Sequence, residues 1–157
     1  MSERIDTGTL LINAPVQAIY NAFLHTSAVE TWLPPAGMSC RVLEYDLRED
    51  GRYRIELTYE TAEPTGGSGK STTSTDVTTG RFVEVVMNER IAQTVEFDSD
   101  DASFAGEMLM TWVFEPTKDG TRVTVTAEHV PAGISEADHA AGIRSSLENL
   151  ARFVEPG

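Results

Sequence analysis

The sequence SEADHAAGIRSSLENLARFV, residues 135–154, limits the folds open to this chain of 157 residues. Ser135 is a good N-cap for a helix, and Asp138 three residues later resembles the acidic member of a capping box. Apolar residues then recur at spacings of four and three, so they form one stripe along a helix: Ile143, Leu147 and Leu150. The sequence therefore predicts one long terminal helix with an apolar face that must be buried.

Most of the chain before this helix is predicted to be β-structure. Residues 52–60 alternate between apolar and polar side chains, which is typical of a half-buried antiparallel strand. Asp50-Gly51, just before them, is a hairpin signal, whereas residues 61–75 are rich in Gly, Ser and Thr and predict a long hairpin loop. The predicted strands of this region are residues 40–46, 52–60, 77–86, 91–97, 106–115 and 121–130.

A short strand and two short helices are predicted at the N-terminal end. Residues 9–12 read as the end of the strand, Asn13 as the N-cap of a helix that ends near His25, and Ser27 as the cap of a second helix that Pro34 stops. An α+β chain with this order buries its apolar faces best when a curved antiparallel sheet wraps around the terminal helix. We therefore expect a helix-grip fold with a cavity between sheet and helix, and residues 1–157 as a single domain.

Composition narrows the possible partners. The net charge is −13, from 25 acidic and 12 basic residues, which argues against nucleic acid and against anionic membrane surfaces. No apolar run is long enough to span a bilayer, and the N-terminus lacks a signal-peptide pattern. Cys40 is the only cysteine, so neither an intrachain disulfide nor a cysteine-based zinc site is expected. We expect a cytoplasmic protein, monomeric or homodimeric.

Four motifs, in order along the chain, give a resemblance to a known superfamily. They are Asn13-Ala14-Pro15-Val16 followed by Ala22-Phe23 and Trp32-Leu33-Pro34, Asp46-x-Arg48-x-x-Gly51-x-Tyr53, Gly80-Arg81-Phe82-Val83-Glu84-Val85 followed by Glu89-Arg90-Ile91, and Gly120-Thr121-Arg122-Val123. With them, residues 9–153 resemble the START-like, Bet v 1-like (SRPBCC) superfamily, and within it bacterial proteins related to the C-terminal domain of the Hsp90 ATPase activator. The resemblance implies the helix-grip fold and its cavity. It implies no single activity, because this superfamily includes lipid carriers, cyclases and hydrolases.

One position departs from the pattern of these relatives. They often have Gly-Trp in the terminal helix, whereas here Gly142 is followed by Ile143. We expect the glycine to let helix and sheet approach closely, and the missing indole to leave more space in the cavity.

The cavity wall can be predicted from side-chain direction. Met108, Met110, Trp112 and Phe114 alternate along one strand and should face the terminal helix. Methionine suits an adaptable apolar ligand surface, although a solid core explains the stripe equally well. The predicted ligand-binding residues are Trp32, Tyr53, Ile55, Met108, Met110, Trp112, His129, His139, Ile143 and Leu147.

The two histidines are the polar members of this set. His129 shares a predicted strand face with apolar residues, and His139 lies one helical turn before Ile143. A neutral imidazole at the cavity mouth would bond a ligand or act as a base. The alternative, an ordinary partly exposed histidine, is the commoner one.

Other candidate motifs have simpler explanations. Residues 64–71 end like a phosphate-binding loop, but Pro64 replaces the first glycine and a strand follows instead of a helix. Asp46 and Arg48 read as an ion pair that stabilises a turn. Asp98, Asp100 and Asp101 read as a solvated turn at a hairpin tip, with weak calcium contact as the alternative. No catalytic cluster and no set of metal ligands with suitable spacing is evident, so we expect no metal and no cofactor.

Three functions remain. The favoured hypothesis is a protein that binds a hydrophobic or amphipathic small molecule between sheet and helix. The alternative is a cyclase- or hydrolase-type enzyme that uses the same cavity. The third is a chaperone-interaction module, which is ranked last because the Hsp90 activator also needs a separate N-terminal domain.

Overall fold

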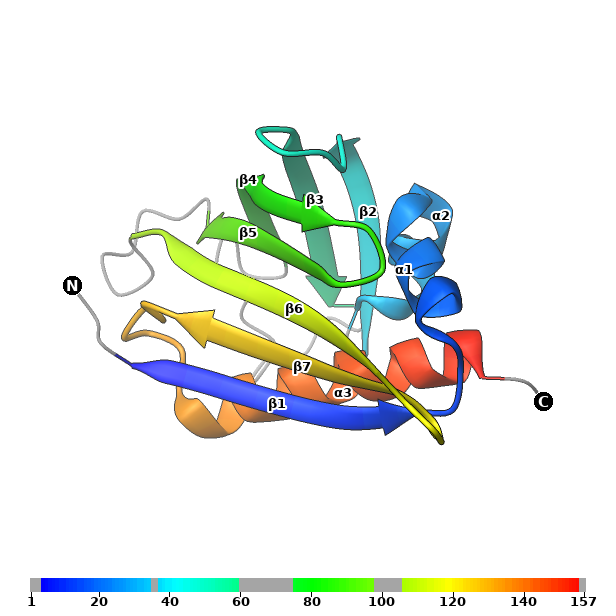
Figure 1. The fold of residues 1–157 in the computed structure, drawn as a ribbon. Coiled ribbons are helices and arrows are strands. Elements are labelled where there is room, and N and C mark those ends of the chain that lie inside the picture. The colour runs from blue at the N-terminus through cyan, green and yellow to red at the C-terminus, as the bar shows by residue number, and fades with distance from the viewer. Residues whose placement is uncertain (1–3, 35–36, 60–74, 98–105, 156–157) are drawn as a thin grey trace.

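The computed structural model describes residues 4–34, 37–59, 75–97 and 106–155. Within them, seven antiparallel strands form one curved sheet, and the helix α3 (Glu136–Val154) lies along its inner face (Figure 1). The other elements, in chain order, are β1 (Ile5–Ile12), α1 (Val16–Leu24), α2 (Thr26–Trp32), β2 (Met38–Tyr45), β3 (Arg52–Tyr59), β4 (Thr75–Val86), β5 (Arg90–Phe97), β6 (Met108–Thr117) and β7 (Gly120–Glu128). The predicted α+β helix-grip fold is confirmed, with its two short helices after the first strand.

The sheet order brings the two ends of the chain together. The strands are arranged β1-β7-β6-β5-β4-β3-β2, so β1 pairs with β7 from Ile5 opposite Glu128 to Ile12 opposite Thr121. The helix α3 follows β7 and packs against β1 (Figure 1). Its predicted apolar stripe is buried in full: Ile143, Leu147 and Leu150. Ser135 is the N-cap, as predicted, and its Oγ accepts a hydrogen bond from the backbone N–H of Asp138 at 3.1 Å.

Inward-facing residues of strand β1 contact successive turns of helix α3. Asp6 and Gly8 lie against His139 and Ile143, respectively. Two strand residues advance about 6.6 Å and four helix residues about 6 Å, so successive inward residues of β1 meet successive turns of α3. The close helix–sheet approach therefore occurs at Gly8. The sequence predicted this close approach at Gly142, and that prediction is wrong, because a Cβ on Gly142 would have no neighbour within 4 Å.

Both predicted caps at the N-terminal helices are wrong. The N-cap of α1 is Pro15, because the chain first makes a tight turn in which the Ala14 N–H donates to the Ile12 carbonyl at 2.9 Å. The N-cap of α2 is His25, which also ends α1. With no loop between the two helices, Ser27 already lies inside the first turn of α2.

Aromatic rings fill the end of the fold where α1 and α2 meet the sheet. The ring of Phe23 lies 5.2 Å from that of Trp112 and 5.4 Å from that of Phe114, measured between centroids. Trp32 lies 5.6 Å from Trp112 and donates its indole N–H to the Ala22 carbonyl at 2.9 Å. This cluster is buried, and it closes one end of the space beneath the sheet.

The ends of several strands differ from the prediction. Strand β1 ends at Ile12, as predicted, and begins at Ile5, whereas β7 ends at Glu128 rather than at residue 130. The predicted turn pair is present, since Arg48 Nε lies 2.8 Å from Asp46 Oδ2. The phosphate-loop-like segment and the acidic turn near position 100 lie outside the described residues, as does nearly all of the predicted long loop. Of the described helices, none has the length and apolar character needed to cross a membrane.

Candidate ligand-binding site

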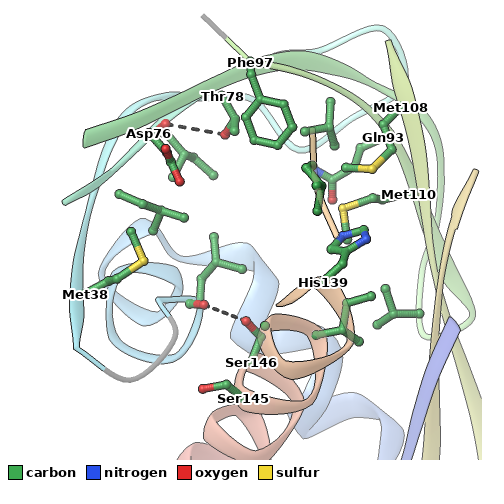
Figure 2. Close-up of a pocket in the computed structure, with 18 of the residues that line it drawn as sticks. Met38, Asp76, Thr78, Gln93, Phe97, Met108, Met110, His139, Ser145 and Ser146 are labelled. Atoms are coloured by element: carbon green, nitrogen blue, oxygen red, sulfur yellow. Dashed lines mark hydrogen bonds between the residues drawn. The ribbon is translucent and has the colours of Figure 1, made fainter. Parts of the chain in front are cut away.

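A cavity of about 730 Å³ lies between the sheet and the N-terminal half of α3 (Figure 2). Strands β3 to β6 and helix α3 supply most of its walls, and α2 and the segment just before α3 help to complete them. Of the residues predicted to bind a ligand, eight line this cavity: Trp32, Tyr53, Ile55, Met108, Met110, Trp112, His139 and Ile143. Strand alternation on β3 and β6 and helical periodicity on α3 therefore placed these side chains on the correct faces.

Two predicted residues lie elsewhere. His129 follows the last residue of β7, has a positive φ of 60° and is exposed, so the strand alternation used to place it no longer applies. Leu147 is buried but does not line the cavity. Its Cδ1 would lie 3.6 Å from a Cβ on Gly8, which places the side chain against β1 in the packed core.

The stripe on β6 is partly cavity wall and partly core. Met108, Met110 and Trp112 line the cavity, whereas Phe114 packs into the aromatic cluster. Figure 2 shows the two thioethers on one side of the cavity and Met38 on the other. The apolar wall is completed by Leu57, Phe97 and Ile134, among others. Flexible thioethers facing an open space suit ligands of varied shape.

The sheet contributes a small number of polar groups to this apolar wall. Asp76 and Thr78 on β4 and Gln93 on β5 face the cavity (Figure 2). The Gln93 Oε1 atom accepts a hydrogen bond from the Trp112 indole at 3.1 Å, and Asp76 is only 3% exposed. The sequence analysis missed all three. Asp76 lies just before the predicted strand 77–86, and Val77, between Asp76 and Thr78, is itself buried, so no alternation of apolar and polar residues marks this face.

The two tyrosines at the cavity have their hydroxyl groups occupied. Tyr53 donates to the Thr94 carbonyl at 2.5 Å, and Tyr45 donates to the Phe23 carbonyl at 2.6 Å. Burial raises the pKa of both phenols well above the ordinary value, so both remain neutral donors at physiological pH. Both hydroxyl protons are thus engaged with backbone carbonyls, and the two side chains shape the wall.

His139 is held by a carboxylate from the first strand. Its Nδ1 atom lies 2.6 Å from Asp6 Oδ2. Arg4 clamps the same carboxylate from the other side, with Nη2 at 3.0 Å from Oδ2 and Nε at 3.2 Å from Oδ1. Burial of Asp6 raises the pKa of its carboxyl, but the hydrogen bonds from His139 and Arg4 outweigh it and hold that pKa below its ordinary value.

Polar contacts attach α3 to the segment after α2 beside the cavity. Ser146 Oγ donates to the Leu33 carbonyl at 2.8 Å, and Asn149 Nδ2 donates to the Pro34 carbonyl at the same distance. Cys40 lies outside the cavity, and burial, with a smaller effect of the Glu30 charge, raises the pKa of its thiol to about 12. In the part of the chain that the structure describes, no three His, Cys, Asp or Glu residues come together as metal ligands.

This combination of a curved sheet, a gripped helix and an internal cavity defines a helix-grip protein of the START-like class. The chain belongs to the family described as Activator of Hsp90 ATPase homolog 1-like protein, whose model matches residues 13–155. The resemblance stated from the sequence motifs is thereby confirmed. None of the curated proteins compared with the chain matches it significantly.

Solved structures share the fold along nearly the whole chain. Protein CV1439 from Chromobacterium violaceum is 32% identical, with a TM-score of 0.84 over 98% of each chain. Protein NE0264 from Nitrosomonas europaea is 21% identical, with a TM-score of 0.68 over 98% of this chain and 95% of that one. An AHSA1-like protein from Aeromonas hydrophila is 17% identical, with a TM-score of 0.72 over 96% of this chain and 92% of that one.

Proposed function

We propose that this protein binds a hydrophobic or amphipathic small molecule in the cavity between the sheet and α3. The observation that carries the proposal is the size and chemistry of the cavity, about 730 Å³ with mostly apolar walls and a few convergent polar groups. Protein interiors are normally packed with few voids larger than a water molecule. Ligand pockets, in contrast, occupy about 300–1,000 Å³ and are lined in this way. A cytoplasmic location and a monomeric or homodimeric state are part of the proposal.

The test is a titration with Nile red, a neutral apolar dye that fluoresces in apolar surroundings. We expect saturable binding to the unmodified protein and its loss in Met110→Trp, because the indole would fill the cavity. Val113→Trp is the matched control. Val113 lies three residues after Met110 on the same strand, faces the opposite side of the sheet and is 40% exposed. Binding that survives Met110→Trp, or that never occurs, would contradict the proposal. If the dye binds as expected, native mass spectrometry of freshly purified protein would identify a natural ligand by its mass.

The Asp6–His139 pair favours a second candidate, a cyclase- or hydrolase-type enzyme that uses the same cavity. A carboxylate that holds Nδ1 of an imidazole is the arrangement that orients a general base. The Cys40 thiol is protonated and outside the cavity, so it offers no nucleophile. Turnover of small aromatic esters that is lost in His139→Phe would establish this candidate.

The family description supports a third candidate, a chaperone-interaction module. It is distinguished from the first two by affinity capture with purified Hsp90, before and after the cavity is blocked by Met110→Trp. Capture that is tight and indifferent to the blocked cavity would favour this candidate.

A further inference from the structure

We propose that His139 sets the ligand specificity of the cavity by accepting a hydrogen bond from a hydroxyl group of the bound molecule. This inference rests on the proposed function and names the ligand class, an apolar molecule that carries an alcohol or phenol group. Asp6 is the positioning residue, because its carboxylate holds the His139 ring from the first strand. Two features of His139 carry the proposal: the tautomer of its ring and the direction in which its second nitrogen points.

The hydrogen bond to Asp6 determines which nitrogen of His139 carries the hydrogen. Nδ1 lies 2.6 Å from Asp6 Oδ2. Burial raises the pKa of the Asp6 carboxyl, but the hydrogen bonds from His139 and Arg4 outweigh it and hold that pKa below its ordinary value, so the group is ionised at neutral pH. An ionised carboxylate only accepts hydrogen bonds, so Nδ1 is the donor. In the neutral ring the other nitrogen, Nε2, then has a lone pair and is an acceptor.

The position of His139 between β1 and the cavity directs Nε2 toward a ligand. The two nitrogens of an imidazole point in nearly opposite directions, so with Nδ1 turned to Asp6 on β1, Nε2 points away from that strand. No residue of β1 lines the cavity, whereas His139 does. Figure 2 shows the ring next to Met110 in the cavity wall. The Nε2 lone pair therefore faces the space that a ligand would fill.

The Asp6 carboxylate is itself fixed, which makes the orientation of the ring reliable. Arg4 donates from Nη2 to Oδ2 at 3.0 Å and from Nε to Oδ1 at 3.2 Å. A bidentate guanidinium of this kind gives a carboxylate one preferred geometry. The side chains of His139 and Asp6 are 13% and 9% exposed, so water competes little with these bonds. An acceptor that is oriented before the ligand arrives loses less entropy on binding.

His139 differs in this respect from several other polar groups at the cavity. The hydroxyl groups that donate to backbone carbonyls are those of Tyr45, Tyr53 and Ser146. A ligand would have to break such a bond in order to accept from one of these groups. A hydroxyl group next to His139 instead gains a hydrogen bond while Asp6 keeps its own. An ether or a methyl group at the same place would leave the Nε2 lone pair buried without a donor, which is costly.

The test compares three probes that share one ring system: 2-naphthol, 2-methoxynaphthalene and 2-methylnaphthalene. Only the naphthol donates a hydrogen bond, and methylation of its oxygen removes the donor but keeps the oxygen. Each probe displaces Nile red from the unmodified protein at neutral pH. We expect the naphthol to bind about five- to tenfold more tightly than 2-methoxynaphthalene, which is the effect of one hydrogen bond to an acceptor that would otherwise be unsatisfied.

Two variants assign this preference to His139 and Asp6. The quantity compared is the ratio of the naphthol affinity to the 2-methoxynaphthalene affinity, which removes any general change in the cavity. His139→Phe deletes the acceptor and should lower the ratio about five- to tenfold. Asp6→Ala should also lower it, because the hydrogen is then free to move from Nδ1 to Nε2. Asp119→Ala, in the exposed turn between β6 and β7, is the matched control and should leave the ratio unchanged.

Nitrogen-15 spectra of the imidazole give a readout that a purely structural role of Asp6 would not change. In the unmodified protein the Nε2 resonance of His139 should be that of an unprotonated nitrogen. It should shift further with 2-naphthol than with 2-methoxynaphthalene, because only the naphthol bonds to it. In Asp6→Ala the resonance should move toward that of a protonated nitrogen.

The outcomes separate this inference from the proposal on which it rests. If Nile red and 2-methylnaphthalene bind but 2-naphthol and 2-methoxynaphthalene bind equally, this inference alone is overturned. It is also overturned if His139→Phe retains the preference for the naphthol. The role of Asp6 is overturned if Asp6→Ala retains both the ratio and the Nε2 resonance. The ranking of probes on the unmodified protein requires no variant to fold. If neither Nile red nor any probe binds, the proposed function and this inference fail together.

Discussion

Gly8 and Ile143 are in such close contact that β1 has no room for a side chain at this position. A Cβ built on Gly8 would lie 2.5 Å from Ile143 Cγ2, and Leu147 Cδ1 would be the next neighbour at 3.6 Å. Ile143 is β-branched and stiff at χ1, so it does not move aside easily. This contact fixes the separation of α3 from β1, and with it the floor of the cavity.

Gly8→Ala should therefore destabilise the protein, although alanine normally suits a strand better than glycine. Forcing one methyl group into a packed interface costs about 1–3 kcal/mol. Ile143→Ala should relieve the clash, so in urea unfolding the double variant should be more stable than the sum of the two single changes predicts. Additive effects would show that the two side chains do not compete for the same space.

Gly142→Ala should have the opposite effect and stabilise the protein by up to about 1 kcal/mol, since glycine in a helix interior is that much less favourable than alanine. A Cβ at Gly142 meets nothing within 4 Å, so no packing penalty offsets the gain. The thermal midpoint should rise, in contrast to that of Gly8→Ala. A lower midpoint would mean that α3 lies closer to the sheet at this point than the structure has it.

Gly8 and Gly142 show which features of this fold can be predicted from the sequence and which cannot. Periodicity identified the stripe on α3 and the inward faces of β3 and β6, because side-chain direction repeats with a fixed period in helices and strands. The contact partner of a glycine is set by the tertiary register, which has no local signal. For that reason the close approach was predicted at Gly142 and is found at Gly8.

In the candidate site, too, contacts between residues close in sequence were predictable, whereas contacts between distant residues were not. The local pair Asp46–Arg48 was predictable because its members are two residues apart, whereas Asp6 and His139 are separated by 133 positions. Asp6 shares the less exposed face of β1 with Gly8 and Leu10, and it would have been identified as inward-facing if the predicted strand had been extended back to Ile5. His129 was misplaced because its positive φ ends the strand alternation that was carried through it.

Asp6→Asn should make stability less dependent on pH in the acid range. The folded state holds the pKa of the Asp6 carboxyl below its ordinary value. The stabilisation it provides is therefore complete above the unfolded pKa, which is about 3.9, and is lost as the pH falls through the lower folded value. In urea unfolding, the stability gap between the unmodified protein and Asp6→Asn should narrow from pH 6 toward about pH 3. Asp119→Asn is the control, and a gap of constant size would show that Asp6 contributes through packing alone.

Trp112→Ala should cost about 3–5 kcal/mol, as truncation of a buried aromatic does. Trp112 is 4% exposed, contacts both Phe23 and Trp32, and donates to Gln93. The same indole lines the cavity, so an apolar ligand should shift or quench its emission, with Trp112→Phe identifying its share of the signal. A Trp112→Ala variant of nearly unchanged stability would contradict the packing of the aromatic cluster.

Ile143→Trp and Leu147→Trp test whether the space beneath the sheet is open. The two positions lie one turn apart on α3 and both are nearly inaccessible to solvent, at 7% and 1% exposure. Only Ile143 lines the cavity. Tryptophan is not branched at Cβ and so has no Cγ2 methyl to press on Gly8, which leaves the indole at position 143 free to turn into the cavity. We expect Ile143→Trp to change the free energy of unfolding by less than about 1 kcal/mol and to weaken Nile red binding by about tenfold or more.

Leu147→Trp is the control, because it overpacks solid core, and it should destabilise the protein by about 1–3 kcal/mol. Equal destabilisation by both substitutions would show that the space next to Ile143 closes in solution, and the ligand-binding proposal would lose its main support.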